Sequence, residues 1–194
     1  MSSPTTFRSL DDVATAVHDC TACPLAAGRL KAVPGSGNPQ SEILFIGEGP
    51  GQKEDEQGIP FVGAAGKFLD EMLAAISLTR ADVFVTNVVK CRPPQNRDPE
   101  PDEIQTCTDL YLWKQIEIMN PKLLVTLGRH SMGLFLSADQ KISQVHGQAK
   151  RVKGRVVLPL YHPAAALYNG SMRATLLYDF KKIPLVLKKI SSVS

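Results

Sequence analysis

The 194-residue sequence predicts an α/β fold, a three-layer α/β/α sandwich with a central four-stranded parallel sheet. Four short runs, at residues 43–47, 83–89, 123–127 and 156–160, are largely apolar. Strands that are apolar on both faces belong to sheets covered on both sides. Segments of helical character separate the runs, and strands alternating with helices favour parallel pairing. Because the chain shows no repeat, low-complexity stretch or linker, we expect residues 1–194 to form a single domain.

The loops beside the predicted strands carry most of the turn-forming residues. A turn-rich stretch at 34–40 precedes the first strand, and a glycine-rich loop follows it. Three acidic residues in that loop are interpreted as solvated: Glu54, Asp55 and Glu56. A proline-rich loop at 93–101 follows the second strand. Ligands of such sheets bind beyond the carboxyl ends of the strands, so these loops are where a site is expected.

Helices are predicted between and beyond the strands. Ser9 and Asp12 form a capping pattern, so the first helix should begin there and run to about His18. Further helices are expected at about 65–77, at about 100–119, after Gly128 and at about 172–189. Pro184 lies inside the last of these and is expected to kink it.

Composition excludes a membrane-spanning or secreted protein and points to a charged partner. No apolar run approaches the roughly 20 residues needed to cross a bilayer, and the N-terminus lacks the apolar region of a signal peptide. We therefore expect a cytoplasmic location. Residues 141–194 hold ten Lys or Arg and one acidic residue, a charge of +9, which leaves −6 on the first 140 residues. This asymmetry favours a polyanion such as nucleic acid, although a solvated, Lys-rich helix would also explain it.

Four cysteines form two spaced pairs, Cys20-x2-Cys23 and Cys91-x15-Cys107. Structural disulfides are rare inside cells, so a metal site built from all four is favoured. Prolines beside Cys23 and near Cys91 are typical of iron–sulfur loops, and the x15 spacing does not match the short second knuckle of a zinc ribbon. An iron–sulfur cluster is thus the first interpretation, with zinc or four buried thiols as the alternatives.

Three polar residues of different chemistry lie at the ends of predicted strands. Glu48 follows the first strand, Asn87 lies near the end of the second, and His162 follows the fourth. Because parallel strands end at one edge of the sheet, a carboxylate, an amide and an imidazole should converge there.

The motifs around these residues resemble those of family 4 uracil-DNA glycosylases, and the resemblance extends from Cys20 to the last helix. It rests on four blocks that occur in order: Gly47-Glu48-Gly49-Pro50-Gly51, Pro60-Phe61-Val62-Gly63 with Gly66, Thr86-Asn87-Val88-Val89-Lys90-Cys91-Arg92-Pro93-Pro94, and His162-Pro163-Ala164-Ala165. The resemblance implies the uracil-DNA glycosylase fold and a [4Fe–4S] cluster on the four cysteines. It also implies a monofunctional glycosylase that hydrolyses the N-glycosidic bond of uracil in DNA and so initiates base excision repair.

The same resemblance implies roles for individual residues. Glu48 matches the acidic residue that positions or activates the attacking water, and His162 matches the histidine near uracil O2. Gly49 matches a backbone position that contacts uracil, Phe61 the aromatic ring that stacks on the base, and Asn87 the amide that recognises its edge. The loop between Gly51 and Phe61 is our candidate for excluding the thymine methyl group.

Contacts with DNA are expected around this pocket. Lys90 and Arg92 are predicted phosphate contacts, and Leu167 or Tyr168 could fill the gap left by a flipped base. Other basic residues are placed near the rim or the fourth strand: Arg97, Lys150, Arg151, Lys153 and Arg155. Two segments depart from the family pattern, Ala166–Gly170 where Leu-Leu-Arg-Asn-Pro is usual, and His146-Gly147 where Arg-Gly is common. A phosphate contact or a supporting hydrogen bond should therefore differ at His146.

The expected partner is uracil-containing DNA, single- or double-stranded, bound by a monomer and without a membrane. The cluster needs no redox role, because the reaction transfers no electrons, and it could set the position of the strand that ends at Asn87. Two further functions stay open: a related glycosylase with another lesion preference, and a non-catalytic iron–sulfur protein that binds DNA or transfers electrons.

Overall fold

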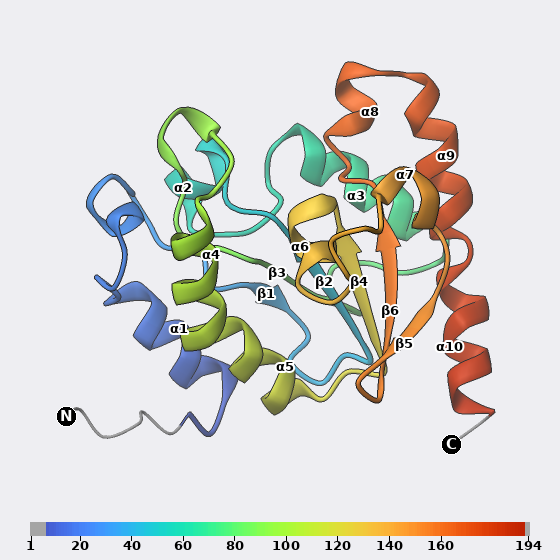
Figure 1. Ribbon diagram of the computed structural model, residues 1–194, viewed down its shortest axis with the longest axis horizontal. Helices are drawn as coiled ribbons and strands as arrows, with labels where there is room; N and C mark the ends of the chain where they lie inside the picture. Colours follow the sequence, from blue (N-terminus) through green and yellow to red (C-terminus); the bar gives the residue numbers. More distant parts are fainter. Residues whose placement is uncertain (1–6, 193–194) are drawn as a thin grey trace.

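The computed structural model describes residues 7–192 and contains the predicted sandwich, a sheet with helices packed on both faces (Figure 1). The strands are β1 Ser36–Gly37, β2 Ile43–Gly47, β3 Phe84–Asn87, β4 Leu123–Leu127, β5 Lys150–Val152 and β6 Arg155–Leu160. The α-helices are α1 Leu10–His18, α2 Gln52–Gln57, α3 Ala64–Ala74, α4 Pro101–Cys107, α5 Trp113–Met119, α6 Arg129–Gly133, α7 Ile142–Val145, α8 Ala165–Tyr168, α9 Ser171–Phe180 and α10 Ile183–Ser191. Short 3₁₀ turns occur at Pro24–Ala27 and Pro94–Asn96.

The sheet has six strands in the order β1-β3-β2-β4-β6-β5, so the prediction of four strands was wrong in number. The four predicted strands form its parallel centre, and β1 and β5 pair antiparallel with β3 and β6 at the two edges. The edge strands span two and three residues and are not fully buried. Strands this short and polar carry no apolar pattern, which is why the sequence did not reveal them.

Two apolar clusters hold the layers together, one on each face of the sheet. On one face, Phe45 and Val125 pack with Leu69 of α3 and Phe180 of α9. On the other face, strand residues pack with α1 and with the α4–α5 segment: Leu44, Ile46, Phe84, Leu124 and Val157 with Val13, Val17, Leu112 and Ile116. Alternate residues of β2 thus point to opposite clusters, as the period of two along a strand requires.

Two of the predicted helices differ from expectation. The predicted 100–119 helix is continuous but contains a π-helical turn, Thr108–Leu112, directly after Cys107. The Thr108 hydroxyl donates to the carbonyls of Ile104 and Gln105 at 2.8 and 3.1 Å, a contact that bends helices. The predicted 172–189 helix breaks at Lys181 and Lys182, next to the expected kink, into α9 and α10. Pro184 is the second residue of α10. Proline is tolerated there because the first amides of a helix have no intrahelical acceptor.

The acidic stretch at 54–56 is not a solvated loop but part of α2, so this interpretation was wrong. Asp55 is buried, and its carboxylate accepts the Leu30 amide at 2.9 Å. By contrast, α1 begins as predicted, with reciprocal capping bonds between Ser9 and Asp12 of 3.1 and 3.0 Å. Among residues 7–192, none of the helices is long and apolar enough to cross a membrane.

Candidate active site and metal centre

The carboxyl ends of three parallel strands bring the predicted polar residues together. Gly47 and Asn87 are register partners on β2 and β3, so Glu48 begins its loop beside Asn87. His162 follows β6 by two residues. A pocket of about 240 Å³ opens here, and the five residues predicted for it all line it: Glu48, Gly49, Phe61, Asn87 and His162.

Phe61 forms one wall of the pocket in an unusual backbone conformation. Its φ is 55°, a left-handed value that a residue with a side chain rarely adopts. The surroundings hold it there, because Arg80 donates from Nη2 to the Phe61 carbonyl at 2.8 Å. Gly66 approaches the same carbonyl so closely that a Cβ would lie 1.7 Å from the oxygen. The ring is consequently stacked against His162, with centroids 5.5 Å apart.

Glu54 holds the two loops that frame the pocket. Its Oε1 accepts the amides of Val62 and Gly63, each at 2.8 Å, and its Oε2 accepts the Gly51 amide at 3.1 Å. One carboxylate thus fixes the glycine-rich loop against the loop that carries Phe61. Sequence reasoning missed this role, because the three acceptor contacts join residues that only the fold brings together.

Asn87 presents an unpaired acceptor inside the pocket. The residue is 2% exposed, and its Oδ1 has no hydrogen-bond partner among the described residues. A Cβ at Gly47 would lie 2.3 Å from this oxygen, so glycine leaves the space that the amide occupies. Buried acceptors are rarely left unpaired, and one that faces a pocket suits a ligand with an N–H group.

His162 is held as a neutral imidazole of defined tautomer. Burial lowers its pKa from 6.5 to about 4, against a weak opposing effect of Glu54. The Ala164 amide donates to Nδ1 at 3.1 Å, so Nδ1 is the acceptor nitrogen. In a neutral ring the other nitrogen then carries the hydrogen, and Nε2 is available as a donor.

The four cysteines meet at a second place, between α1, the end of α4 and the chain after β3. They line one small cavity together with Arg29, Lys90 and Tyr111. None forms a disulfide, and burial raises the pKa of Cys107 to about 11. Arg29 donates to the Cys91 sulfur at 3.2 Å, and the Lys90 amide donates to the Cys107 sulfur at 3.3 Å. Four thiols around one cavity, with donors aimed at two sulfurs, fit a thiolate-bound metal centre.

Comparison with known proteins agrees with this geometry. Residues 34–182 match the family model described as the uracil DNA glycosylase superfamily. The chain is 50% identical to a type-4 uracil-DNA glycosylase of Sulfurisphaera tokodaii, over 90% of this chain and 83% of the relative. Similar proteins of the same description occur in Archaeoglobus fulgidus, at 48% identity over 91% and 92% of the two chains, and in Thermotoga maritima, at 42% over 93% and 95%.

The chain belongs to the type-4 uracil-DNA glycosylases.

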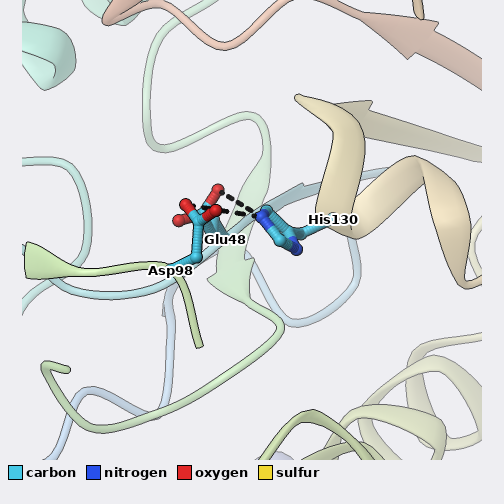
Figure 2. A group of neighbouring side chains, drawn as sticks. All are labelled: Glu48, Asp98 and His130. Carbon is cyan, nitrogen blue, oxygen red and sulfur yellow. Dashed lines mark ion pairs between the residues drawn. The ribbon is translucent and has the colours of Figure 1, made fainter. Parts of the chain in front are cut away.

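In this type-4 glycosylase, Glu48 lies with Asp98 and His130 in a group of polar side chains that the sequence did not predict (Figure 2). His130 of α6 places Nε2 3.7 Å from the Glu48 carboxylate and 3.6 Å from the Asp98 carboxylate. Burial raises the pKa of Glu48, and the nearby His130 opposes that rise while Asp98 adds to it. Arg129 forms an ion pair with Asp98. Its positive charge disfavours the binding of a metal cation between Glu48, Asp98 and His130. The neighbours of Glu48 thus act in opposite directions on its pKa: His130 and Arg129 lower it, and Asp98 raises it.

The predicted DNA contacts of the glycosylase separate into two kinds. Lys90 is 1% exposed and is hydrogen-bonded inside the protein, so the prediction that it contacts DNA was wrong. Arg92 lies at the surface, where it donates to Asn96 at 2.7 Å. Leu167 and Tyr168 are 50% and 92% exposed on α8, directly after the strand end that carries His162.

Among the remaining basic residues of the glycosylase, Arg97 lines the pocket, as its expected place near the rim requires. Arg97 is bound by the Glu103 carboxylate at 2.7 and 2.9 Å. Four basic residues lie on β5, on the β5–β6 turn and at the start of β6, beside the fourth predicted strand as expected, but toward the end opposite His162: Lys150, Arg151, Lys153 and Arg155. β6 is six residues long, and the sequence did not show toward which of its ends these basic residues would lie.

His146, which stands where the family commonly has arginine, is part of a partly buried hydrogen-bond network around the buried Asp179. Its Nδ1 lies 2.5 Å from the Asp179 carboxylate, which also accepts from Lys182 at 2.7 Å. The imidazole packs on Tyr161, with ring centroids 4.7 Å apart. Because Tyr161 precedes His162, this network supports the chain at the edge of the pocket.

Proposed function

We propose that this protein excises uracil from DNA as a monofunctional glycosylase, hydrolysing the N-glycosidic bond as the first step of base excision repair. The observation that carries the proposal is the unpaired Asn87 Oδ1 in a pocket walled by Phe61 and His162. The names of its type-4 relatives agree with this function. A base inside a duplex is inaccessible, so the enzyme must flip it out at a cost of a few kcal/mol.

Asn87 supplies the selectivity between uracil and cytosine. Its Oδ1 accepts from uracil N3–H and its amide nitrogen donates to O4, whereas cytosine places an acceptor and a donor in the opposite positions. Sites that depend on buried hydrogen bonds reject a mismatched analogue by about 10⁴-fold or more in favourable cases. Phe61 stacks on the base, which contributes roughly 1–3 kcal/mol with little preference among bases.

His162 stabilises the leaving group. When the bond between N1 and C1′ breaks, its electron pair goes to the uracil ring and negative charge grows on O2. The Nε2–H of His162 donates a hydrogen bond to that oxygen. Removing one such donor from an oxyanion site elsewhere costs about 2.7–4 kcal/mol of transition-state stabilisation. Because the imidazole of His162 is neutral at neutral pH, it can donate this hydrogen bond without first gaining or losing a proton.

Glu48 completes the hydrolysis. The carboxylate orients a water toward C1′, accepts its proton as the new C–O bond forms, and stabilises the positive charge on the sugar. General-base catalysis of this kind contributes about 10²–10⁴-fold to the rate.

We further propose that Cys20, Cys23, Cys91 and Cys107 hold a [4Fe–4S] cluster with a structural role. Bound there, it would join the loop after α1 to the end of α4 and to the chain after β3. A brown colour with broad absorbance near roughly 400 nm is expected for the cluster. Colourless protein with one zinc per chain, or with metal-free thiols, would contradict this assignment.

DNA containing uracil is the proposed partner, bound by a monomer inside the cell. Arg92 is the proposed phosphate contact, since it donates to Asn96, which lines the pocket. The exposed Leu167 and Tyr168 are proposed to enter the stack beside a flipped base.

The test is cleavage of a labelled oligonucleotide with one uracil, followed by hot alkali. Glu48→Ala and His162→Ala should each lose at least about 100-fold in rate. Glu117→Ala and His18→Ala remove the same groups from exposed positions and should leave the rate unchanged. Cleavage that survives both active-site changes would refute the residue roles. Absence of cleavage by protein with an intact cluster would refute uracil excision, and a panel of modified bases would then test another lesion preference.

A further inference from the structure

Lys90 is a buried cation whose three donors are all used inside the protein. Its Nζ lies 2.6 Å from Thr86 Oγ1, 2.6 Å from the Asn87 carbonyl and 2.7 Å from Gln115 Oε1. An ammonium group has three hydrogens and no acceptor, so three acceptors satisfy it completely. A neutral amine would turn its lone pair toward one of these oxygens. The geometry therefore matches the charged form.

Within residues 7–192, the ionisable groups that can compensate the charge of Lys90 are the thiols of the cysteine site. All three of its acceptors are neutral, and among residues 7–192 no carboxylate is its hydrogen-bond or ion-pair partner. Lys90 lines the same small cavity as the thiols of Cys91 and Cys107, and each thiolate would favour its charged form. A buried charge is unfavourable unless an opposite charge compensates it. Four thiolates around an iron–sulfur cluster would supply that opposite charge.

The same residue contacts both the cysteine site and the base-recognition strand. Its backbone amide donates to the Cys107 sulfur at 3.3 Å, while its side chain holds the Asn87 carbonyl. Gln115 and Thr86 are fixed in turn, since both donate to the Pro34 carbonyl at 2.7 and 2.9 Å. The Asn87 backbone is thus attached to a rigid, buried network, and its side chain extends from that backbone into the pocket.

We propose that Lys90 is a positioning residue that couples the negative charge of the cysteine-bound cluster to the placement of Asn87 in the uracil pocket. This inference rests on the proposed function. The cluster charge stabilises the buried ammonium, the ammonium holds the end of β3, and the end of β3 sets the amide that recognises the base. Loss of the cluster charge would then weaken uracil recognition although no ligand of the cluster touches the base.

The first arm of the test measures the cluster itself. Lys90→Met keeps the length of the side chain and removes its charge and donors. A nearby cation favours the reduced, more negative cluster, so its removal should move the reduction potential to a more negative value in protein-film voltammetry. Lys114→Met removes the same charge from an exposed position beside Gln115 and should leave the potential unchanged. An unchanged potential in Lys90→Met, or an equal shift in both variants, overturns the electrostatic link.

The second arm measures the pocket. Inhibition by free uracil reports on Asn87, whereas affinity for abasic DNA reports on the rest of the binding surface. Lys90→Met should weaken uracil inhibition by at least tenfold and leave the affinity for abasic DNA unchanged. In an Asn87→Ala background the same substitution should have no further effect, because both changes act through one group. Uracil inhibition equal to that of the parent protein, or fully additive losses, overturns the link to Asn87.

A third variant tests the proposal if Lys90→Met does not fold or does not bind its cluster. Thr86→Val removes one acceptor of the ammonium while it preserves shape, charge and cysteines. Uracil inhibition should again weaken with the cluster present, and unaltered inhibition overturns the proposal. If the parent protein releases no uracil from DNA, the proposed function fails, and the potential of Lys90→Met still tests the coupling to the cluster.

Discussion

Gly47 is the last residue of β2 and leaves room for the two groups that meet the base. A Cβ at this position would lie 2.3 Å from Asn87 Oδ1 and 2.7 Å from two ring carbons of Phe61. Contacts this short cannot persist, so Gly47→Ala must displace the amide, the ring or both. Overpacking of this kind costs typically about 1–3 kcal/mol of folding free energy. For a chain of this size that corresponds to a fall in Tm of about 2–12 °C.

The functional loss should exceed the loss of stability. The displaced amide can no longer align with N3–H and O4, and one unpaired buried group costs about 1–3 kcal/mol. With a further loss of stacking of roughly 1–3 kcal/mol, kcat/KM for uracil-containing DNA should fall by about 30-fold or more. The assay is single-turnover cleavage at a temperature where calorimetry shows the variant to be fully folded.

Gly133→Ala is the matched control. Gly133 is an exposed residue of α6, and a Cβ there meets nothing within 4 Å. Alanine in a helix is more favourable than glycine by about 0.5–1 kcal/mol, so this variant should be slightly more stable and fully active. Parent-like cleavage by folded Gly47→Ala would refute the location of the base beside Asn87 and Phe61.

Three further predictions concern pH and salt. His130→Ala removes a group that lowers the raised pKa of Glu48, so the acid limb of the pH–rate profile should move to higher pH. An acid limb at the parent pH would show that His130 does not influence the ionisation of Glu48 during catalysis. The pKa of His162 is lowered to about 4, so the unfolded chain binds a proton there between about pH 6.5 and 4 while the folded chain does not. Stability should therefore fall as the pH drops through this window, and His162→Gln, which cannot titrate, should flatten the fall in urea unfolding measured by fluorescence. Arg92→Ala should weaken DNA binding and reduce the slope of log binding constant against log salt concentration by about one. Lys153→Ala, at the far end of β6, should change neither quantity. Equal effects of the two substitutions in binding titrations at several salt concentrations would mean that DNA covers both regions.

The positions of the reactive groups were predictable because they depend on local patterns. Apolar runs predicted the central strands, and parallel strands place the loops after them at one edge of the sheet. Glu48, Asn87 and His162 accordingly line one pocket. The cysteines were equally visible, since residue type and spacing suffice to suggest a shared metal site.

Lys90 shows why the predicted DNA contacts were less reliable. A lysine within a basic, proline-rich segment resembles a phosphate contact, yet this one points into the protein. Its acceptors Thr86 and Gln115 are 29 residues apart in the chain, and the direction of a side chain depends on such distant partners. Nor did the sequence show that basic residues such as Lys153 lie toward the end of β6 opposite His162, because the charge of a segment does not say which end of a strand it adjoins.

The sequence by itself therefore determined the α/β class, the central strands, the residues at their ends and the thiol set. These depend on hydrophobic periodicity and residue chemistry, which are properties of short segments. The tertiary structure alone decided the left-handed Phe61, the carboxylate of Glu54 between two loops, the tautomer of His162 and the burial of Lys90. Each of these depends on partners that only folding brings within hydrogen-bond distance, and no local pattern encodes them.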